Sequence, residues 1–343
     1  MQFAVFDHLD RRDEPLQQFY DDRLKLAAAA ERLGFYAYHI AEHHGTPLGM
    51  APSPSVFLAA LAQRTSSIRI GPMVYLLALY PPLRLIEEIS MIDNLSGGRL
   101  HVGVGRAVSP HESGFFGVDF EDGWNHYAEA LDVITTGLYA DRLDWDSARF
   151  RYDDVPIELH PMQDPVPLWC APAQPLSIEL AAQYGMHIVS LGPVARVKEI
   201  SDAYREAWDT HKDSARRRYS AVNGGDPFIG AYRLIYVADS DAEARRTIGP
   251  AFDHWFDSIA KLWRERGGSA SLLLMDSYEK ACAAGMMVAG SPETVRDALA
   301  SQAEETGFDY AMLEFAFGNL GHDREMASLE LFAAEVMPGL RDL

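Results

Sequence analysis

Residues 68–106 read IRIGPMVYLLALYPPLRLIEEISMIDNLSGGRLHVGVGR, and this stretch contains the unit that decides the fold. Its apolar and β-branched start predicts a strand over Ile68–Tyr75. Helical spacing follows over Pro82–Leu95, where proline suits the first turn and the Ser-Gly-Gly at 96–98 ends the helix. A further strand is predicted over Leu100–Gly103. Because a connecting helix returns the chain to the same edge, these two strands are expected to run parallel.

The same alternation of strand and helix patterns extends through most of the chain. We therefore predict an α/β fold, a (β/α)₈ TIM barrel in which residues 1–343 form one domain. Eight strands are predicted, starting near residues 2, 36, 68, 100, 168, 187, 228 and 310, and helices are predicted over Leu16–Leu33, Ser53–Thr65, Pro82–Leu95, Pro175–Tyr184, Val194–Lys212, Ser240–Trp263 and Pro292–Thr306.

Two long insertions interrupt this regular pattern, at about residues 107–167 and 264–289. The first contains a predicted helix over Trp124–Leu138 and a predicted hairpin near Phe150–Leu159. Both follow strands, so we expect both at the carboxyl-terminal face, where barrels build their active sites. They are interpreted either as surface decoration or as a lid over the site.

Composition excludes several classes of partner. The chain has 343 residues with 30 basic and 50 acidic side chains, a net charge of −20, which disfavours nucleic acid and anionic membrane surfaces. The apolar run Met73–Tyr80 is too short to span a membrane, and the first ten residues do not resemble a signal peptide. The two cysteines, Cys170 and Cys282, have no metal-type spacing and favour a cytoplasmic location, and Cys170 is predicted to be core.

Glu42-His43-His44 directly follows the second predicted strand and contains the first candidates for catalysis. Side chains alternate between the faces of a strand, so only one of the two histidines is expected to enter the barrel mouth. Histidine suits proton transfer near neutral pH, and the alternative is a pair of structural histidines. No His-x-His, His-Glu-x-x-His or Gly-x-Ser-x-Gly motif is found, so we predict neither a metal site nor a serine nucleophile.

Two further segments are candidates for binding a phosphate. Gly103 and Gly105 end the fourth strand and allow a ligand close to the backbone, and Arg106 presents a planar cation there. The segment 170–177 joins the fifth strand to a helix whose free backbone N–H groups would bind an anion, although an ordinary helix start is the simpler interpretation. Trp255 is interpreted either as core or as the wall of a flavin or substrate pocket. Together these features are compatible with FMN.

The order and spacing of these motifs resemble those of the bacterial-luciferase-like flavin monooxygenases, in the luciferase alpha-subunit branch, over nearly the full chain. The residues that carry the resemblance are Gly34-Phe35, Ala41-Glu42-His43-His44, Ile70-Gly71, Pro81 to Arg84, Glu87, Asp93 to Arg99, Gly103-Val104-Gly105-Arg106, Ala181-Ala182 with Gly185, His254-Trp255-Phe256-Asp257, Val288 to Glu293 and Val336-Met337-Pro338.

This resemblance implies a barrel that binds reduced FMN, supplied by a separate flavin reductase, at the carboxyl ends of its strands. It implies that O₂ adds to the flavin C4a carbon and that the resulting peroxide oxygenates a small aldehyde, ketone or similar substrate. By position it implies an acid/base role for His43 and a homodimer. The cofactor-binding residues that it implies are Met73 and Val74 against the flavin ring, often with a non-prolyl cis peptide, and Arg106, Val108, Ala173, Gln174 and Ser177 around the phosphate.

The sequence also departs from the family. Gly105 stands where the luciferase subunit has a cysteine, Ala173 where an acidic residue is common, and Leu191 where a tryptophan is expected. Leu191 and Trp255 are the predicted substrate-pocket residues, and these departures lower the expectation of light emission. Two alternatives stay open: an F420- or flavin-dependent hydride-transfer enzyme on the same barrel, and a non-catalytic flavin-binding partner subunit.

Overall fold

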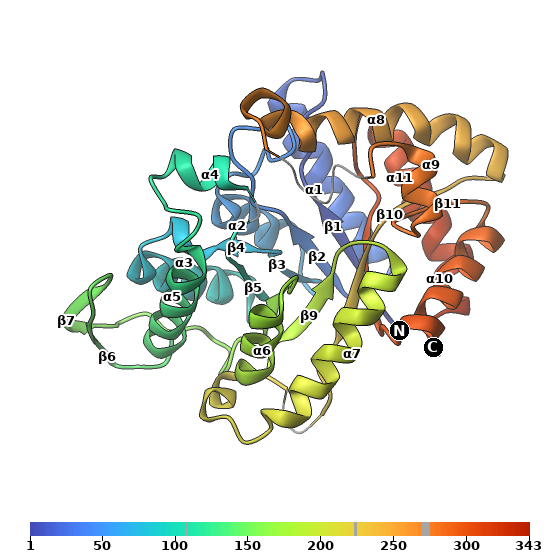
Figure 1. The fold of residues 1–343 in the computed structure, drawn as a ribbon. Helices are drawn as coiled ribbons and strands as arrows, with labels where there is room; N and C mark the ends of the chain where they lie inside the picture. The colour runs from blue at the N-terminus through green and yellow to red at the C-terminus, as the bar shows by residue number, and fades with distance from the viewer. Residues whose placement is uncertain (108, 223–224, 269–274) are drawn as a thin grey trace.

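Parallel strands form a central barrel that is surrounded by helices in the computed structural model (Figure 1). The structure describes residues 1–107, 109–222, 225–268 and 275–343. The amino and carboxyl termini lie close together, and the N-terminal ammonium donates to the Arg341 carbonyl at 2.8 Å.

Every neighbouring pair of strands in the barrel is parallel, as predicted. The hydrogen-bonded order is β3-β2-β1-β12-β10-β9-β8-β5-β4, and a parallel bridge between Ile70 and Leu100 closes the ring. Because β3 and β4 occupy one position, the barrel has eight positions and the predicted fold is confirmed. The strands are β1 (Gln2–Asp7), β2 (Ala37–Ile40), β3 (Arg69–Pro72), β4 (Tyr75–Leu76), β5 (Val102–Gly105), β8 (Leu168–Cys170), β9 (His187–Ser190), β10 (Ile229–Val237) and β12 (Tyr310–Glu314).

The third predicted strand, Ile68–Tyr75, is divided in the structure. Its first part, β3, pairs with β2, and its second part, β4, pairs with β5. Between them the Met73–Val74 peptide bond is cis. A Cβ on Gly103 would lie 2.2 Å from the Pro72 carbonyl oxygen, so only glycine lets β5 approach this break so closely.

The helices form the outer layer, and each predicted helix is present. Several begin with a proline in the first turn, where its missing N–H costs no hydrogen bond. The α-helices are α1 (Leu16–Arg32), α2 (Pro54–Arg64), α3 (Pro82–Ser96), α4 (Pro110–Phe115), α5 (Gly123–Gly137), α6 (Pro175–Tyr184), α7 (Val194–Thr210), α8 (Asp241–Arg266), α9 (Tyr278–Ala283), α10 (Pro292–Thr306) and α11 (His322–Leu331), followed by the π-helical segment η4 (Phe332–Val336).

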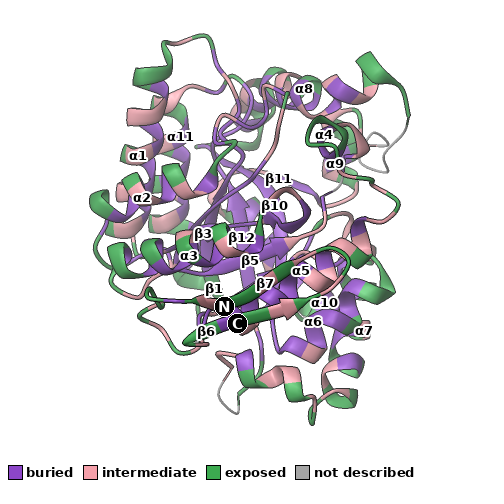
Figure 2. Cartoon of the chain, turned by 90° about the vertical axis from the view of Figure 1, so that its left-hand side faces the viewer, coloured by how far each residue is buried: buried purple, intermediate pink, exposed green. Residues whose placement is uncertain are grey.

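The insertions are only partly at the carboxyl-terminal face. In the first, α4 lies there, but the hairpin of β6 (Arg142–Asp146) and β7 (Arg151–Pro156) packs along the outer side of α5 and is largely exposed (Figures 1 and 2). The second contains a strand that sequence analysis missed, β11 (Met287–Gly290), which pairs with the end of β10. Its residues 269–274 lie outside the described part of the chain.

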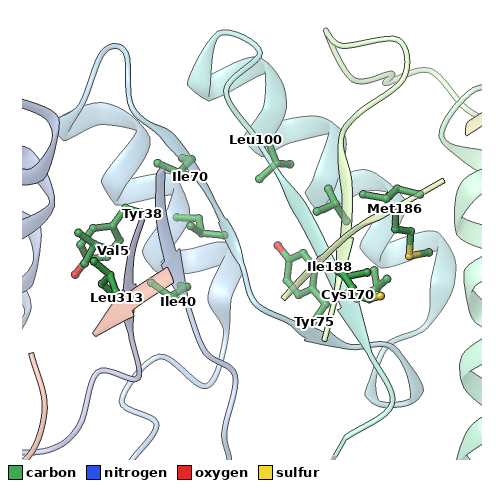
Figure 3. Packing of buried hydrophobic residues seen from close by; sticks show 14 of the residues in the cluster. Val5, Tyr38, Ile40, Ile70, Tyr75, Leu100, Cys170, Met186, Ile188 and Leu313 are labelled. Atoms are coloured by element: carbon green, nitrogen blue, oxygen red, sulfur yellow. The ribbon is translucent and has the colours of Figure 1, made fainter. Parts of the chain in front are cut away.

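Strand alternation divides the buried side chains into two layers. Outward-facing residues such as Val5, Ile40 and Leu313 pack against the helices (Figure 3). Inward-facing residues such as Phe6, Met312 and Trp169 fill the barrel interior. Cys170 is in the outer layer with 4% of its surface exposed, which confirms it as core. None of the helices in the described ranges is long and apolar enough to cross a membrane.

Candidate active site

Inward-facing side chains from several strands meet at the carboxyl end of the barrel. The alternation that points Phe6 inward on β1 also points His8 inward, two residues later, and Glu314 follows Met312 in the same way on β12. Tyr232 of β10 and His43, beyond the end of β2, complete the group. The pleat of parallel strands thus gathers two imidazoles, a carboxylate and a phenol.

His43 binds a carboxylate that comes from the first insertion. Its Nδ1 lies 3.1 Å from Glu112 Oε1, and the side chains of His43 and Glu112 are 16% and 4% exposed. Burial lowers the pKa of His43, but the charges of Glu112, Glu42 and Glu314 outweigh burial and raise it above its usual range. The protonated imidazole of His43 is therefore stabilised relative to that of an unperturbed histidine.

His44 points elsewhere, as the prediction from strand alternation required. Its Nε2 lies 3.0 Å from Glu42 Oε1, and its ring stacks edge-on against Phe116 with centroids 4.6 Å apart. Glu42 also accepts the Leu76 backbone N–H at 3.0 Å. Glu42 and His44 therefore tie the end of β2 to β4 and support the loop that carries His43.

His8 has its own carboxylate and was not among the predicted site residues. Its Nδ1 lies 2.8 and 2.9 Å from the two oxygens of Glu314, which also accepts the Tyr232 hydroxyl. The His8 and His43 rings are 5.6 Å apart and tilted by 31°. The period-2 pattern of β1 and β12 contained the signal for His8 and Glu314, whereas Glu112 carries no such pattern because it lies in an insertion.

The two predicted pocket residues lie in different surroundings. Trp255 of α8 is 2% exposed, and its ring lies 6.2 Å from His8 and 5.5 Å from Phe252. Its indole N–H has no partner among the described residues. Leu191 follows β9 and is 46% exposed.

Arg106 lies half-buried beyond the end of β5. Its guanidinium stacks over Phe120 and Trp124, 4.0 and 4.9 Å from the ring centroids, and donates to the Phe120 carbonyl at 3.3 Å. Within the described part of the chain no carboxylate lies within 4.0 Å of it. Burial lowers its pKa, yet arginine stays charged. The guanidinium of Arg106 is therefore fixed in place with no carboxylate beside it in the described residues, and it can bind an anion.

The start of α6 is capped by its own side chains, which corrects the expectation of free backbone donors. The Ser177 hydroxyl oxygen accepts the N–H groups of Ala173 and Gln174 at 3.1 and 3.0 Å. The segment lies beside Arg106 in the fold, since the register pairs Val104 with Cys170 on neighbouring strands. An anion would compete with Ser177 for these N–H groups. The positive charge of Arg106 has no such competitor and is the main attraction for an anion here.

Met73 and Val74 occupy the break between β3 and β4. Met73 is 7% exposed and belongs to the interior layer. A Cβ on Gly105 would lie 2.4 Å from Val74 Cγ2, so the glycine that replaces a family cysteine makes room for Val74. Val108 lies outside the described residues.

The arrangement can carry proton transfer beside an anion. Each central imidazole uses Nδ1 for a carboxylate, which leaves Nε2 for chemistry.

The sequence model of the luciferase-like monooxygenase family matches residues 1–312. The chain belongs to the luciferase-like monooxygenase family. The resemblance seen in the sequence is thereby confirmed.

Two curated relatives match the chain over nearly all of its length. It is 37% identical to the uncharacterized protein y4wF of Sinorhizobium fredii over 98% of this chain and 96% of that protein. It is 28% identical to the oxygenase component of the flavin-dependent trigonelline monooxygenase of Acinetobacter baylyi, over 100% and 96% of the two chains.

Solved structures of monooxygenases have the same fold. The monooxygenase RslO1 of Streptomyces bottropensis superposes with a TM-score of 0.86 at 25% identity, covering 98% of this chain and 99% of that one. The oxygenating constituent of 3,6-diketocamphane monooxygenase of Pseudomonas putida, solved in complex with FMN, gives 0.81 at 22% identity over 99% and 98%.

Proposed function

We propose that this protein is a monooxygenase that uses reduced FMN and O₂ to oxygenate a small organic substrate such as an aldehyde or ketone. The observation that carries the proposal is the buried His43–Glu112 pair at the strand ends of a barrel in which β5 presents Arg106 with no carboxylate within 4.0 Å among the described residues. Membership of a monooxygenase family supports the same reaction class.

The residues present fit FMN. Arg106, fixed between two aromatic rings, matches a phosphate in charge and geometry. Ala173 and Gln174 precede α6 next to it and Ser177 lies in its first turn, while Met73, Val74 and Glu112, whose Oε2 has no partner among the described residues, border the barrel mouth. When bound, reduced flavin supplies the electrons that activate O₂.

The protein's own part in the reaction is to bind the cofactor, to orient the reacting groups and to supply a proton. In this proposal His43, with a pKa raised above its usual range, would deliver a proton from Nε2 while Glu112 keeps its ring in place. Trp255 and the interior layer exclude water from the region behind the imidazoles.

A separate flavin reductase is the proposed source of reduced FMN. The trigonelline enzyme is named as an oxygenase component, which supports a two-component system. The F420 alternative predicts anaerobic hydride transfer, and the partner-subunit alternative predicts no turnover without a second chain.

The first experiment supplies the purified protein with photoreduced FMN and ¹⁸O₂ and offers decanal, cyclohexanone and thioanisole as probes. We expect one ¹⁸O atom in an oxygenated product and the other in water. Anaerobic reduction of F420 in place of oxygenation would support the alternative. Failure to bind reduced FMN at tens of micromolar would contradict the proposal.

Replacement of Arg106 tests the phosphate site. Arg106→Ala should weaken binding of FMN by about 10- to 100-fold, because a charged hydrogen bond to phosphate is lost, and should change riboflavin binding less than twofold. Arg151→Ala, an exposed arginine of the outer hairpin, is the matched control. Equal losses for FMN and riboflavin would remove Arg106 from the phosphate site.

A further inference from the structure

Glu314 is surrounded by hydrogen-bond donors, and this fixes the state of His8. The Tyr232 hydroxyl, the His8 ring and the His8 backbone N–H, at 3.4 Å, all contact this carboxylate, which is fully buried. A carboxylate with these neighbours acts as an acceptor only, so His8 carries a proton on Nδ1. In the neutral ring Nε2 then holds a lone pair.

The open nitrogen of His8 belongs to a ring that lies beside the ring of His43. The two rings lie 5.6 Å apart, and Nε2 has no hydrogen-bond partner in the residues that the structure describes. A carboxylate that fixes an imidazole through Nδ1 and leaves Nε2 open is the arrangement that makes histidine a general base. The groups that face His8 are Glu314 on β12, Tyr232 on β10, His43 beyond β2 and Trp255 on α8.

The proposed reaction moves protons in two directions. Substrate, O₂ and reduced flavin give oxygenated substrate, oxidised flavin and water, so the oxygen atom that leaves as water gains two protons and reduced flavin loses two. One site that gives a proton and one that takes a proton are both required. The carboxylate of Glu112 beside His43 favours its protonated ring, which can give a proton. The tautomer of His8, with its proton on Nδ1, leaves Nε2 able to take one.

We propose that His8 is a second catalytic residue, a general base whose Nε2 accepts a proton released by the reduced flavin during turnover and passes it on to solvent. Glu314 and Tyr232 are its positioning residues. This proposal rests on the proposed function. It assigns the two histidines different tasks: His43 delivers a proton and His8 removes one.

The test compares His8→Asn with the wild type, because the asparagine amide can replace Nδ1 toward Glu314 but has no second nitrogen. We expect reduced-FMN affinity and O₂ uptake within twofold of the wild type. Product per flavin oxidised should fall at least tenfold, with hydrogen peroxide accounting for the difference. The low-pH limb of kcat/KM should disappear, which a loss of packing alone would not cause. Loss of product with an unchanged pH profile would overturn the proposal.

Chemical rescue provides the control. Added imidazole should restore turnover to His8→Gly and should not affect His44→Gln, in which the amide can still reach Glu42. Tyr232→Phe should lower kcat without changing KM, because Glu314 loses one donor. Unimpaired coupling in both His8 variants would overturn the proposal.

A substrate-independent measurement separates this proposal from the function itself. In ¹⁵N-histidine-labelled protein, once the His8 ring is neutral, its Nε2 signal should be that of an unprotonated nitrogen, and Glu314→Gln should shift the tautomer. If no probe is oxygenated while this signal is as expected, the proposed reaction fails and the assignment of the base stands. A protonated Nε2 would overturn the assignment whatever the turnover.

Discussion

Asp10 is a buried carboxyl group behind the candidate site. Its Oδ2 accepts the Gly318 N–H at 3.0 Å, and its Oδ1 has no partner in the described ranges. Burial raises its pKa to about 7, and the nearby Glu314 charge adds to the effect, while Ser258 and His254 oppose it. Asp10 is therefore a carboxyl group that takes up a proton close to neutral pH.

Asp10→Asn should stabilise the protein at high pH. The native pKa lies above the unfolded value of about 3.9, so wild-type stability falls as the pH rises from about 4 through 7. The amide cannot ionise, and the variant should be more stable by roughly 2–4 kcal/mol at pH 8, with a smaller gain at pH 5. Urea unfolding measures this, with the exposed Asp13→Asn as control. A gain that does not depend on pH would contradict the assigned pKa.

At the scale of elements, the short helix α4 determines the state of His43. Ser109 caps this helix through the Glu112 N–H at 3.3 Å, and His111 contacts the Gly267 carbonyl at the end of α8 at 3.0 Å. Glu112 is thus held over the barrel by contacts on both sides. The element that raises the pKa of His43 is an insertion and not part of the barrel.

Glu112→Gln should lower the pKa of His43, since burial then acts without its main opposing charge. A histidine with a raised native pKa stabilises the fold below its unfolded value of about 6.5, and this is lost as the pH rises through the native pKa. The variant should lose more stability at pH 6 than at pH 9. NMR titration and urea unfolding check both points against the exposed Glu158→Gln. An unchanged midpoint would mean that Glu112 is not the partner.

At the scale of the molecule, the carboxyl-terminal segment packs against the first strands of the chain. Phe332 of η4 is fully buried and contacts Phe3, Phe35 and Phe315 with ring centroids 5.4–6.0 Å apart. These residues lie on or beside β1, β2 and β12, where the first strand of the chain pairs with the last. Closure therefore depends on residues more than 300 positions apart in the sequence.

Phe332→Ala should destabilise the protein by about 3–5 kcal/mol, because a fully packed aromatic ring leaves a cavity. Chemical unfolding should show this loss, and Phe116→Ala, with half of its surface exposed, should cost less than about 1 kcal/mol. Similar losses for the two variants would show that the carboxyl-terminal segment is not part of the cooperative unit.

By itself the sequence determined the barrel and the direction of its side chains. Strand and helix periods are local, so Ile68–Arg106 already predicted parallel strands, and the period of two predicted that only one of His43 and His44 faces inward. The same rule, applied to Phe6 and Met312, would have found His8 and Glu314.

Only the tertiary structure decided which charges meet. Glu112 lies 69 residues from His43 and Glu314 lies 306 residues from His8, and no local period relates them. It also decided that Ser177 occupies the N–H groups of Ala173 and Gln174 before α6 and that the hairpin packs outside α5. The physical reason is that alternation sets the face on which a side chain lies, whereas pKa and hydrogen bonding depend on which charge the closed barrel places beside it.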